Sequence, residues 1–412
     1  MSSRRSFLIG SALTAAASSS AVGANERIRV GFIGTGTRGS YMSTVAEEFE
    51  DCQIAAMCDV YKTTLTSAVA KLKTKPVDTY GDYRRVLERK DIDAVYVATP
   101  DHWHAQMIIE ASQAGKDIYC EKPLSNNIEA GWKAVEVAKS LKRVVQIGLQ
   151  QRSWDHFQKC NDLVQSGMFG TIFHAKLHWQ GFYTPRTAVE PSPVPEGLDW
   201  ELFQGPAERH PYSSLRRNWR SFYTYGGGII TDQGVHIADV VAWYMKTRAP
   251  ISVSGSGQYV QAPVNLECPP DSFQISAVFP KFVMSHTNAY FPQTDYLSDQ
   301  GNYFYGSVGA LHINRQSYTY RLMPGRTGGG ARGGATPPPP PFEPFNTKFA
   351  YVGKPSDSAH IRNWLDNIKS RGTPLTPPET GFYSTLPLLM GLLAIRNGKT
   401  YTWDETTHTA KA

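Results

Sequence analysis

Residues 28–39, IRVGFIGTGTRG, decide the fold of this chain. A short apolar run typical of a β-strand leads into Gly34, Gly36 and Gly39, and a helix-forming segment follows. This G-x-G-x-x-G spacing allows a tight turn, a close approach of a pyrophosphate group and close packing of the helix on the strand. The amino end of the helix then faces the phosphates. The stretch predicts a dinucleotide-binding unit; the alternative is a glycine turn in an unrelated doubly wound sheet.

Asp59 closes the next expected strand, at residues 52–59. It follows the glycine turn by about 20 residues, where an acidic side chain binds the ribose hydroxyls of a dinucleotide. A carboxylate at that place repels a 2′-phosphate. The sequence therefore favours NAD over NADP.

Strands and helices alternate up to about residue 150, and the pattern then changes. Short apolar strands separated by helices predict an α/β Rossmann domain, a doubly wound parallel sheet at 26–150. Long alternating, aromatic-rich runs predict a C-terminal α+β domain at 151–400 with a large, mostly antiparallel open sheet. The first domain's expected strands are 27–34, 52–59, 93–100, 117–120 and 143–148; the second's are 171–183, 251–260, 271–280, 282–291 and 317–323. The second domain's expected helices are 156–165, 232–245, 358–372 and 380–398, and a low-complexity loop is expected at about 324–345.

Composition excludes several classes of protein. The formal charge of +6 over 412 residues is spread along the chain, so we expect no nucleic-acid partner. The five cysteines form no C-x-x-C pair and no metal-ligand spacing with histidines, so we expect neither a metal site nor a disulfide framework.

Residues 1–24 have the pattern of an export signal. Arg4 and Arg5 precede a weakly apolar, alanine-rich stretch that is too short and too polar to span a bilayer. The segment resembles a twin-arginine signal peptide, whose machinery carries folded proteins. We therefore expect export to the periplasm and no membrane span; the alternative is a disordered tail with two chance arginines.

Four further motifs follow the glycine turn in a characteristic order. They are VATPDHWHA at 97–105, YCEKPL at 119–124, QIGLQQR at 146–152 and GGGIITDQGVHIAD at 226–239. Together they resemble the glucose–fructose oxidoreductase/inositol dehydrogenase family (Gfo/Idh/MocA), from residue 27 to the final helices. The resemblance implies a Rossmann domain followed by a domain whose open sheet mediates dimers or tetramers. It also implies oxidation or reduction of sugars, cyclitols and related alcohols with NAD(P).

The resemblance implies three catalytic residues. Lys122 follows a buried strand, where its amine can stabilise the alkoxide that forms as hydride leaves. Asp232 and His236, four residues apart at the start of an expected helix, share one face, and His236 suits the role of base. The alternatives are a surface lysine, a helix-capping aspartate and a structural histidine.

The remaining site residues are expected around these three. Cofactor contacts are expected from Gly34, Gly36, Thr37, Arg38, Gly39, Asp59, Thr99, Pro100, His104, Glu121 and Lys122. Substrate contacts are expected from Arg152, Trp219, Arg220 and Tyr223. A packed aromatic loop is the alternative for the last three.

Three functions are compatible with these residues. The first is an NAD-dependent oxidoreductase acting on a carbohydrate, self-associated through its C-terminal sheet. The second is a glycosidase that uses bound NAD in a redox-neutral cycle; the intact Glu-Lys-Pro motif favours the first. The third, a non-catalytic cofactor-binding protein, is disfavoured by the presence of Lys122, Asp232 and His236 together.

Overall fold

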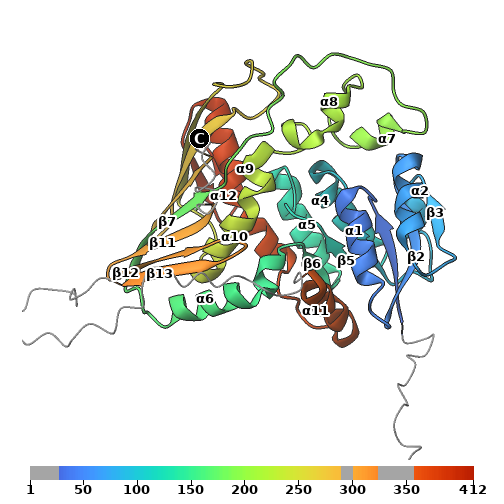
Figure 1. Ribbon diagram of the computed structural model, residues 1–412, viewed down its shortest axis with the longest axis horizontal. Helices are drawn as coiled ribbons and strands as arrows, with labels where there is room; N and C mark the ends of the chain where they lie inside the picture. Colours follow the sequence, from blue (N-terminus) through green and yellow to red (C-terminus); the bar gives the residue numbers. More distant parts are fainter. Residues whose placement is uncertain (1–26, 289–299, 323–356) are drawn as a thin grey trace, which may run out of the picture.

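Two β-sheets with helices packed on them organise the chain (Figure 1). The computed structural model describes residues 27–288, 300–322 and 357–412. The expected signal peptide at 1–24 and the low-complexity loop at about 324–345 lie outside the described residues. Within the described ranges, no helix is long and apolar enough to cross a membrane.

The first sheet has six parallel strands and confirms the predicted Rossmann fold. Its core is a row of stacked rings, with 4.8 Å between the centroids of Phe32 and Tyr96 and 4.4 Å between those of Tyr96 and Tyr119. The strand order β3-β2-β1-β4-β5-β6 reverses direction between β1 and β4, which opens a crevice at the carboxyl edge. The strands are β1 Ile28–Ile33, β2 Cys52–Cys58, β3 Asp78–Tyr80, β4 Ala94–Val97, β5 Asp117–Cys120 and β6 Val145–Ile147.

Helices from both ends of the chain cover this sheet. Its own helices are α1 Thr37–Ala46, α2 Lys62–Lys71, α3 Arg84–Leu87, α4 Asp101–Gln113 and α5 Ile128–Ser140. The helix α11 Asp357–Ser370 comes from the far end of the sequence and completes the layer. Its Trp364 is fully buried and meets the rings of Tyr96 and Tyr119 edge-on. The nucleotide-binding unit is therefore closed by a C-terminal segment.

Among the described residues the second sheet has nine strands in the order β13-β12-β11-β7-β10-β9-β8-β14-β15, and only β7 and β10 pair in parallel. This confirms the mostly antiparallel sheet. Its strands are β7 Ile172–His178, β8 Ser252–Gln258, β9 Ser272–Val278, β10 Val283–Thr287, β11 Gly301–Gly306, β12 Gly309–Ile313, β13 Tyr318–Leu322, β14 Tyr401–Asp404 and β15 Thr409–Lys411. The helices are α6 Asp155–Gln165, α7 Trp200–Gln204, α8 Ser214–Arg217, α9 Gly228–Asp232, α10 Gly234–Tyr244 and α12 Pro378–Asn397, with 3₁₀ turns at Gln150–Ser153 and Trp219–Ser221.

The long helix α12 joins the two halves of the molecule (Figure 1). One side contacts α5 and β6 of the nucleotide-binding unit, and another contacts β8 and β9 of the large sheet. Close packing on both sides is visible at Gly381, where a Cβ atom would lie 2.7 Å from Ile147, and at Gly391, where it would lie 2.6 Å from Ile275. The two sheets are thus held by one continuous apolar core.

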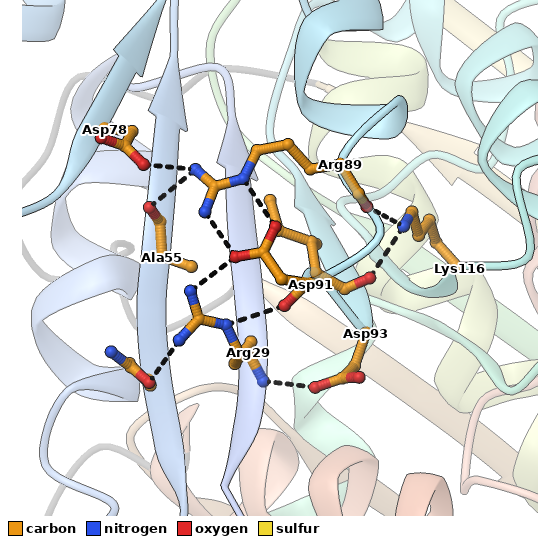
Figure 2. A network of polar contacts seen from close by, with 9 residues as sticks. Arg29, Ala55, Asp78, Arg89, Asp91, Asp93 and Lys116 are labelled. Atoms are coloured by element: carbon orange, nitrogen blue, oxygen red, sulfur yellow. Dashed lines mark hydrogen bonds and ion pairs between the residues drawn. The ribbon is translucent and has the colours of Figure 1, made fainter. Parts of the chain in front are cut away.

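A polar network ties together the amino ends of the parallel strands (Figure 2). The carboxylate of Asp91 pairs with Arg29 at 2.7 Å and with Arg89 at 2.6 Å, and Arg89 also reaches Asp78. Lys116 donates to the main-chain oxygen of Ile92. These contacts lie at the edge of the sheet opposite the crevice.

The attachment of α11 predicts a stability change. The guanidinium of Arg362 lowers the pKa of Asp51 to about 2, against the opposing effect of burial, and Lys369 contributes. This stabilisation is present above the ordinary pKa of 3.8 and is lost as pH falls toward about 2. Asp51→Asn should lower the free energy of unfolding at pH 7 by about 1.5–3 kcal/mol, the usual scale for a hydrogen bond to a charged group.

The matched control is Asp366→Asn, because Asp366 also pairs with Arg362 but is 62% exposed. Urea unfolding should show a change below about 0.5 kcal/mol for this variant. Equal losses for the two variants would mean that Asp51 does not anchor α11.

Candidate active site

A cavity of about 570 Å³ lies between the two halves of the molecule, at the carboxyl edge of the parallel sheet. Gly34, Asp59 and Thr99 line it from the ends of β1, β2 and β4, and Lys122 lines it just after β5. Asp232 closes it from α9 of the second domain. The cavity therefore occupies the crevice that the strand order predicts.

The glycine turn leaves open space where a pyrophosphate would lie. Gly34 has φ +84°, and a Cβ atom there would meet the backbone of Ala98 at 2.7 Å. A Cβ at Gly39 would lie 1.9 Å from the main-chain oxygen of Gly34. At Gly36, which lines the cavity at the amino end of α1, a Cβ would meet nothing within 4 Å. Two glycines are thus required by the fold, while Gly36 keeps space for a ligand, so the turn fits a dinucleotide.

Asp59 is held in one orientation by the turn. One carboxylate oxygen accepts hydrogen bonds from the backbone N–H of Thr35 at 2.7 Å and from its hydroxyl at 3.1 Å, and the other accepts from the N–H of Tyr61 at 2.9 Å. Burial raises the pKa of Asp59, and these bonds only partly offset it. A carboxylate has room for further donors, so Asp59 can still accept from ribose hydroxyls.

Arg38 and Glu121 line the cavity, but their charged groups bind each other. Arg38 donates to Glu121 at 2.7 Å and to Asp357 of α11 at 2.9 Å, and Tyr96 donates to Glu121 at 2.6 Å. Burial raises the pKa of Glu121, but Arg38 and Tyr96 outweigh it, so the net shift is downward. This network fixes α1, β5 and α11 relative to one another beside the turn that carries Lys122.

Lys122 and Asp232 form an ion pair across the domain boundary. The amine donates to Oδ1 of Asp232 at 2.7 Å and to its main-chain oxygen at 2.7 Å, and the side chains are 13% and 5% exposed. Tyr183 donates to the other carboxylate oxygen at 2.8 Å. Burial alone would raise the pKa of Asp232, but Lys122 and Arg220 reverse the shift and lower it well below its usual range. Asp232 is therefore ionised, and it orients Lys122 toward the cavity.

The structure corrects the prediction of one helix from 232 to 245. The main-chain oxygen of Asp232 accepts from Lys122 at 2.7 Å. The N–H of His236 donates to the main-chain oxygen of Gln233, at 3.2 Å. Asp232 is the last residue of α9, and His236 belongs to α10. Both still line the same cavity.

His236 is a neutral imidazole. It is 3% exposed, and its Nδ1 has no hydrogen-bond partner among the described residues. Burial lowers its pKa well below the usual value, and Lys122 and Arg315 lower it further. A neutral ring beside the amine of Lys122 can accept a proton from a hydroxyl group.

His104 lines the cavity but is engaged with the backbone. Its ring nitrogens lie 2.6 Å from the main-chain oxygen of Pro123 and 2.9 Å from that of Thr99. The ring thus connects the turn after β4 to the turn that carries Lys122. We infer that His104 positions these turns, while Thr99 and Pro100 face the cavity with it.

The four expected substrate contacts separate into two pairs. Trp219 and Arg220 line the cavity, with the guanidinium 4.3 Å from the indole ring. Arg152 lies outside it, because its guanidinium compensates the buried carboxylate of Asp239 at 2.7 Å. Tyr223 also lies outside and packs against Arg396. The structure therefore does not bring Arg152 and Tyr223 to the site.

Sequence reasoning missed several residues of the cavity wall. They are Asp101, Gln150, Tyr183, Arg217, Gln233 and Arg315. The signal that could have identified Asp101 was its place in the VATPDHWHA motif at 97–105. Arg315 enters from the turn between β12 and β13, with its guanidinium 4.7 Å from the ring of Trp179. No spacing along the chain connects such loop residues to the glycine turn. Among the described residues no cluster of His, Cys, Asp or Glu could hold a metal ion.

Two family models match consecutive parts of the chain. The model described as "Oxidoreductase family, NAD-binding Rossmann fold" matches residues 28–149, and "Oxidoreductase family, C-terminal alpha/beta domain" matches residues 155–263. The chain belongs to the Gfo/Idh/MocA oxidoreductase family. Membership confirms the resemblance found in the sequence and supports a nicotinamide dinucleotide as the cofactor.

The individual proteins that this chain resembles carry either glycosidase or dehydrogenase names. A glycosyl hydrolase family 109 protein of Shewanella putrefaciens is 33% identical over 167 residues, 37% of this chain and 36% of that protein. This match spans about a third of the relative's length. Myo-inositol 2-dehydrogenase of Lactobacillus plantarum has a TM-score of 0.64 at 17% identity, covering 91% of this chain and 99% of that one. A levoglucosan dehydrogenase in complex with NADH and levoglucosan has a TM-score of 0.65 at 17% identity, covering 91% and 98%. These two likenesses show the shared fold.

The glycine turn yields a paired prediction. Gly36→Ala should fold with an unchanged melting temperature, because its Cβ meets no protein atom, yet it should bind NAD about tenfold or more weakly, a loss of at least ~1.4 kcal/mol. Gly39→Ala should lower the melting temperature, because its Cβ would collide with the main-chain oxygen of Gly34. Calorimetric titration and thermal unfolding measure both effects. Wild-type NAD affinity in Gly36→Ala would show that the pyrophosphate does not approach this residue.

Proposed function

We propose that this protein is an NAD-dependent oxidoreductase that transfers hydride between a bound nicotinamide and a sugar, a cyclitol or a sugar derivative. The observation that carries the proposal is the convergence of Lys122, Asp232 and His236 in one cavity beside the glycine turn. The dehydrogenase names of proteins with the same fold support a carbohydrate substrate.

The residues of this chain have separate roles in the proposed reaction. The α1 amino end and Gly36 would hold the pyrophosphate, and Asp59 the ribose; when bound, the nicotinamide supplies the hydride acceptor. Lys122 would donate a hydrogen bond to the reacting hydroxyl and stabilise the negative charge on its oxygen. A ring nitrogen of His236 would accept the hydroxyl proton. Asp232 would keep Lys122 oriented toward the cavity.

A redox-neutral glycoside hydrolase is the second candidate. It is favoured by the glycosyl hydrolase family 109 names of the curated relatives. The same three residues would begin the reaction, and the aglycone would leave before the hydride is returned. The two functions differ in whether reduced cofactor accumulates.

Purified protein with added NAD should be incubated with free sugars, cyclitols and nitrophenyl glycosides. The absorbance of NADH and that of nitrophenol should be recorded in the same reaction. The proposal predicts NADH formation with at least one free sugar or cyclitol, reduced about 10²-fold or more in His236→Asn. Nitrophenol release without net NADH would instead establish the glycosidase. No reaction with any compound would contradict both functions.

Cofactor choice gives a separate prediction. Asp59 would repel a 2′-phosphate, whereas the neighbouring cation of Arg217, stacked 4.7 Å from the ring of Tyr61, would attract one. Asp59→Ser should therefore weaken NAD binding by about 1.5–3 kcal/mol and raise the NADP-to-NAD affinity ratio. Arg217→Ala in the same background should reverse the gain for NADP. An unchanged ratio in Asp59→Ser would remove Asp59 from the ribose site.

Export and self-association complete the proposal. Arg4 and Arg5 support twin-arginine export to the periplasm, and the five cysteines are all free and buried, as suits a chain that folds before export. The rings of Tyr303 and His312 stack on one face of the large sheet. We propose that this face joins copies of the chain; light scattering of the purified protein would measure the oligomeric state.

A further inference from the structure

Arg315 reaches the cavity from a closed turn of the large sheet. It lies at 314–317, between β12 and β13. The side chain of Asn314 closes this turn, because its Oδ1 accepts hydrogen bonds from the backbone N–H of Gln316 at 2.9 Å and of Ser317 at 2.8 Å. Asparagine side chains stabilise turns in this way. The turn therefore holds the backbone of Arg315 in one place at the cavity wall.

Two contacts fix the guanidinium group of Arg315. It lies 4.7 Å from the centre of the ring of Trp179, and its Nη2 donates to Oε1 of Gln233 at 3.3 Å. The Nε2 amide of Gln233 donates in turn to Oδ2 of Asp232 at 2.9 Å. Since an arginine can only donate and a carboxylate can only accept, the amide of Gln233 has one orientation that satisfies both. Gln233 thus links Arg315 to the carboxylate that binds Lys122.

Arg315 differs from other arginines of the cavity in having no carboxylate partner. Within the described ranges its guanidinium forms no ion pair, and the bond to the amide is its only hydrogen bond. Arg38 binds two carboxylates, and Arg220 lies 3.3 Å from Asp232. Arg217 also lacks an ion pair there, but it belongs to the ribose end of the cavity. Because a guanidinium has five N–H donors, most of those of Arg315 are left for a ligand.

An uncompensated guanidinium is costly where water is partly excluded. Arg315 is partly buried, and burial lowers its pKa against the opposing effect of Asp232. Asp357 also acts on it, but that carboxylate binds Arg38 at 2.9 Å. Arginine keeps its charge at neutral pH. An anion bound in the cavity would therefore remove a cost that a neutral hydroxyl group would leave.

We propose that Arg315 determines specificity by binding an anionic group of the substrate, so that the site takes an acidic carbohydrate in preference to its neutral counterpart. The group is a carboxylate or a phosphate ester, because a planar guanidinium matches either one through two parallel hydrogen bonds. This inference rests on the proposed function and narrows its substrate class. Arg315 would hold the acidic group while the reacting hydroxyl lies beside Lys122 and His236.

Stability separates this role from a structural one. Arg315→Met keeps the apolar stem and removes a charge that no described residue compensates, so it should melt at or above the wild-type temperature. The matched control is Arg152→Met, which should melt at a lower temperature because it leaves the buried carboxylate of Asp239 unpaired. Thermal unfolding measures both. An equal fall in the two variants would show that Arg315 supports the fold and would overturn the proposal.

Binding can be measured without turnover. Protein saturated with NAD would be titrated calorimetrically with matched sets: glucose, glucuronate and glucose 6-phosphate; galactose, galacturonate and galactose 6-phosphate; myo-inositol and myo-inositol 1-phosphate. At least one acid should bind about tenfold or more tightly than its neutral counterpart, the scale of a hydrogen bond to a charged group. The acid that gains affinity identifies the group as a carboxylate or a phosphate ester.

The variants assign this preference to one side chain. It should disappear in Arg315→Met and persist in part in Arg315→Lys, which keeps the charge but loses the planar donors. The matched control is Arg186→Met, because Arg186 is exposed, stacks 5.2 Å from the ring of Phe182 and lies outside the cavity. This control should retain the preference, and NAD affinity should stay unchanged in all three variants.

Turnover gives the same comparison in kinetic terms. For an acid that is oxidised, Arg315→Met should raise KM by about 10–10²-fold and leave kcat nearly unchanged, because the acidic group is bound equally in the ground state and the transition state. The KM for the neutral counterpart should not change.

Equal affinity for acids and neutral compounds in every set would overturn the proposal, and so would an equal loss for both in Arg315→Met. A fall in NAD affinity with an unchanged preference would show that Arg315 binds the cofactor, which would also overturn it. Tighter binding of acids without hydride transfer would contradict the proposed function and still support Arg315 as the anion-binding residue. Hydride transfer from neutral compounds alone would support the proposed function and overturn this inference.

Discussion

The ion pair between Lys122 and Asp232 is the contact on which the site depends. It joins the end of the parallel sheet to the second domain, with both side chains largely withdrawn from water. A buried pair of this kind is costly unless further hydrogen bonds complete it. Here Tyr183 completes the carboxylate, and the main-chain oxygen of Asp232 accepts a second bond from the amine. The bond to the main chain lies at the last residue of α9, just before α10, which carries His236.

Other parts of the structure hold this pair in place. Arg38 links α1 to Glu121, the residue before Lys122, and also to α11. His104 fixes the following Pro123 to the turn after β4. The cavity thus acquires its charges from both domains, and Lys122 is positioned by Asp232 of the second domain together with these residues of the nucleotide-binding unit. One consequence is that the pKa of Asp232 is lowered, whereas burial raises the pKa of Asp101, which lines the same cavity without these partners.

The sequence predicted the first domain well, because its signals are local. A glycine turn between an apolar strand and a helix is typical of a dinucleotide-binding unit. Gly34 and Gly39 are required by contacts within a few residues or with the adjacent strand. The large sheet was predicted as a class, but β11, β12, β14 and β15 were not predicted individually. All four are short, so their alternation spans too few residues to detect.

Within the site, the structure brings together the residues that a motif carries and leaves out a residue that long-range packing occupies. Lys122, Asp232 and His236 meet as expected, whereas Arg152 is occupied by Asp239, 87 residues along the chain. The partner of Asp232, Lys122, lies 110 residues before it along the chain. Such contacts leave no periodic trace in the sequence.

A double-mutant cycle on Lys122 and Asp232 tests the central claim most directly. Turnover of the best substrate and NAD affinity would be measured for Lys122→Met, Asp232→Asn and the double variant. If the pair acts as a unit, each single change lowers kcat about 10²-fold or more, the double change costs little beyond either one, and NAD affinity stays near that of the wild type. Fully additive losses, or wild-type turnover in Asp232→Asn, would show that the two residues act separately and would contradict this account.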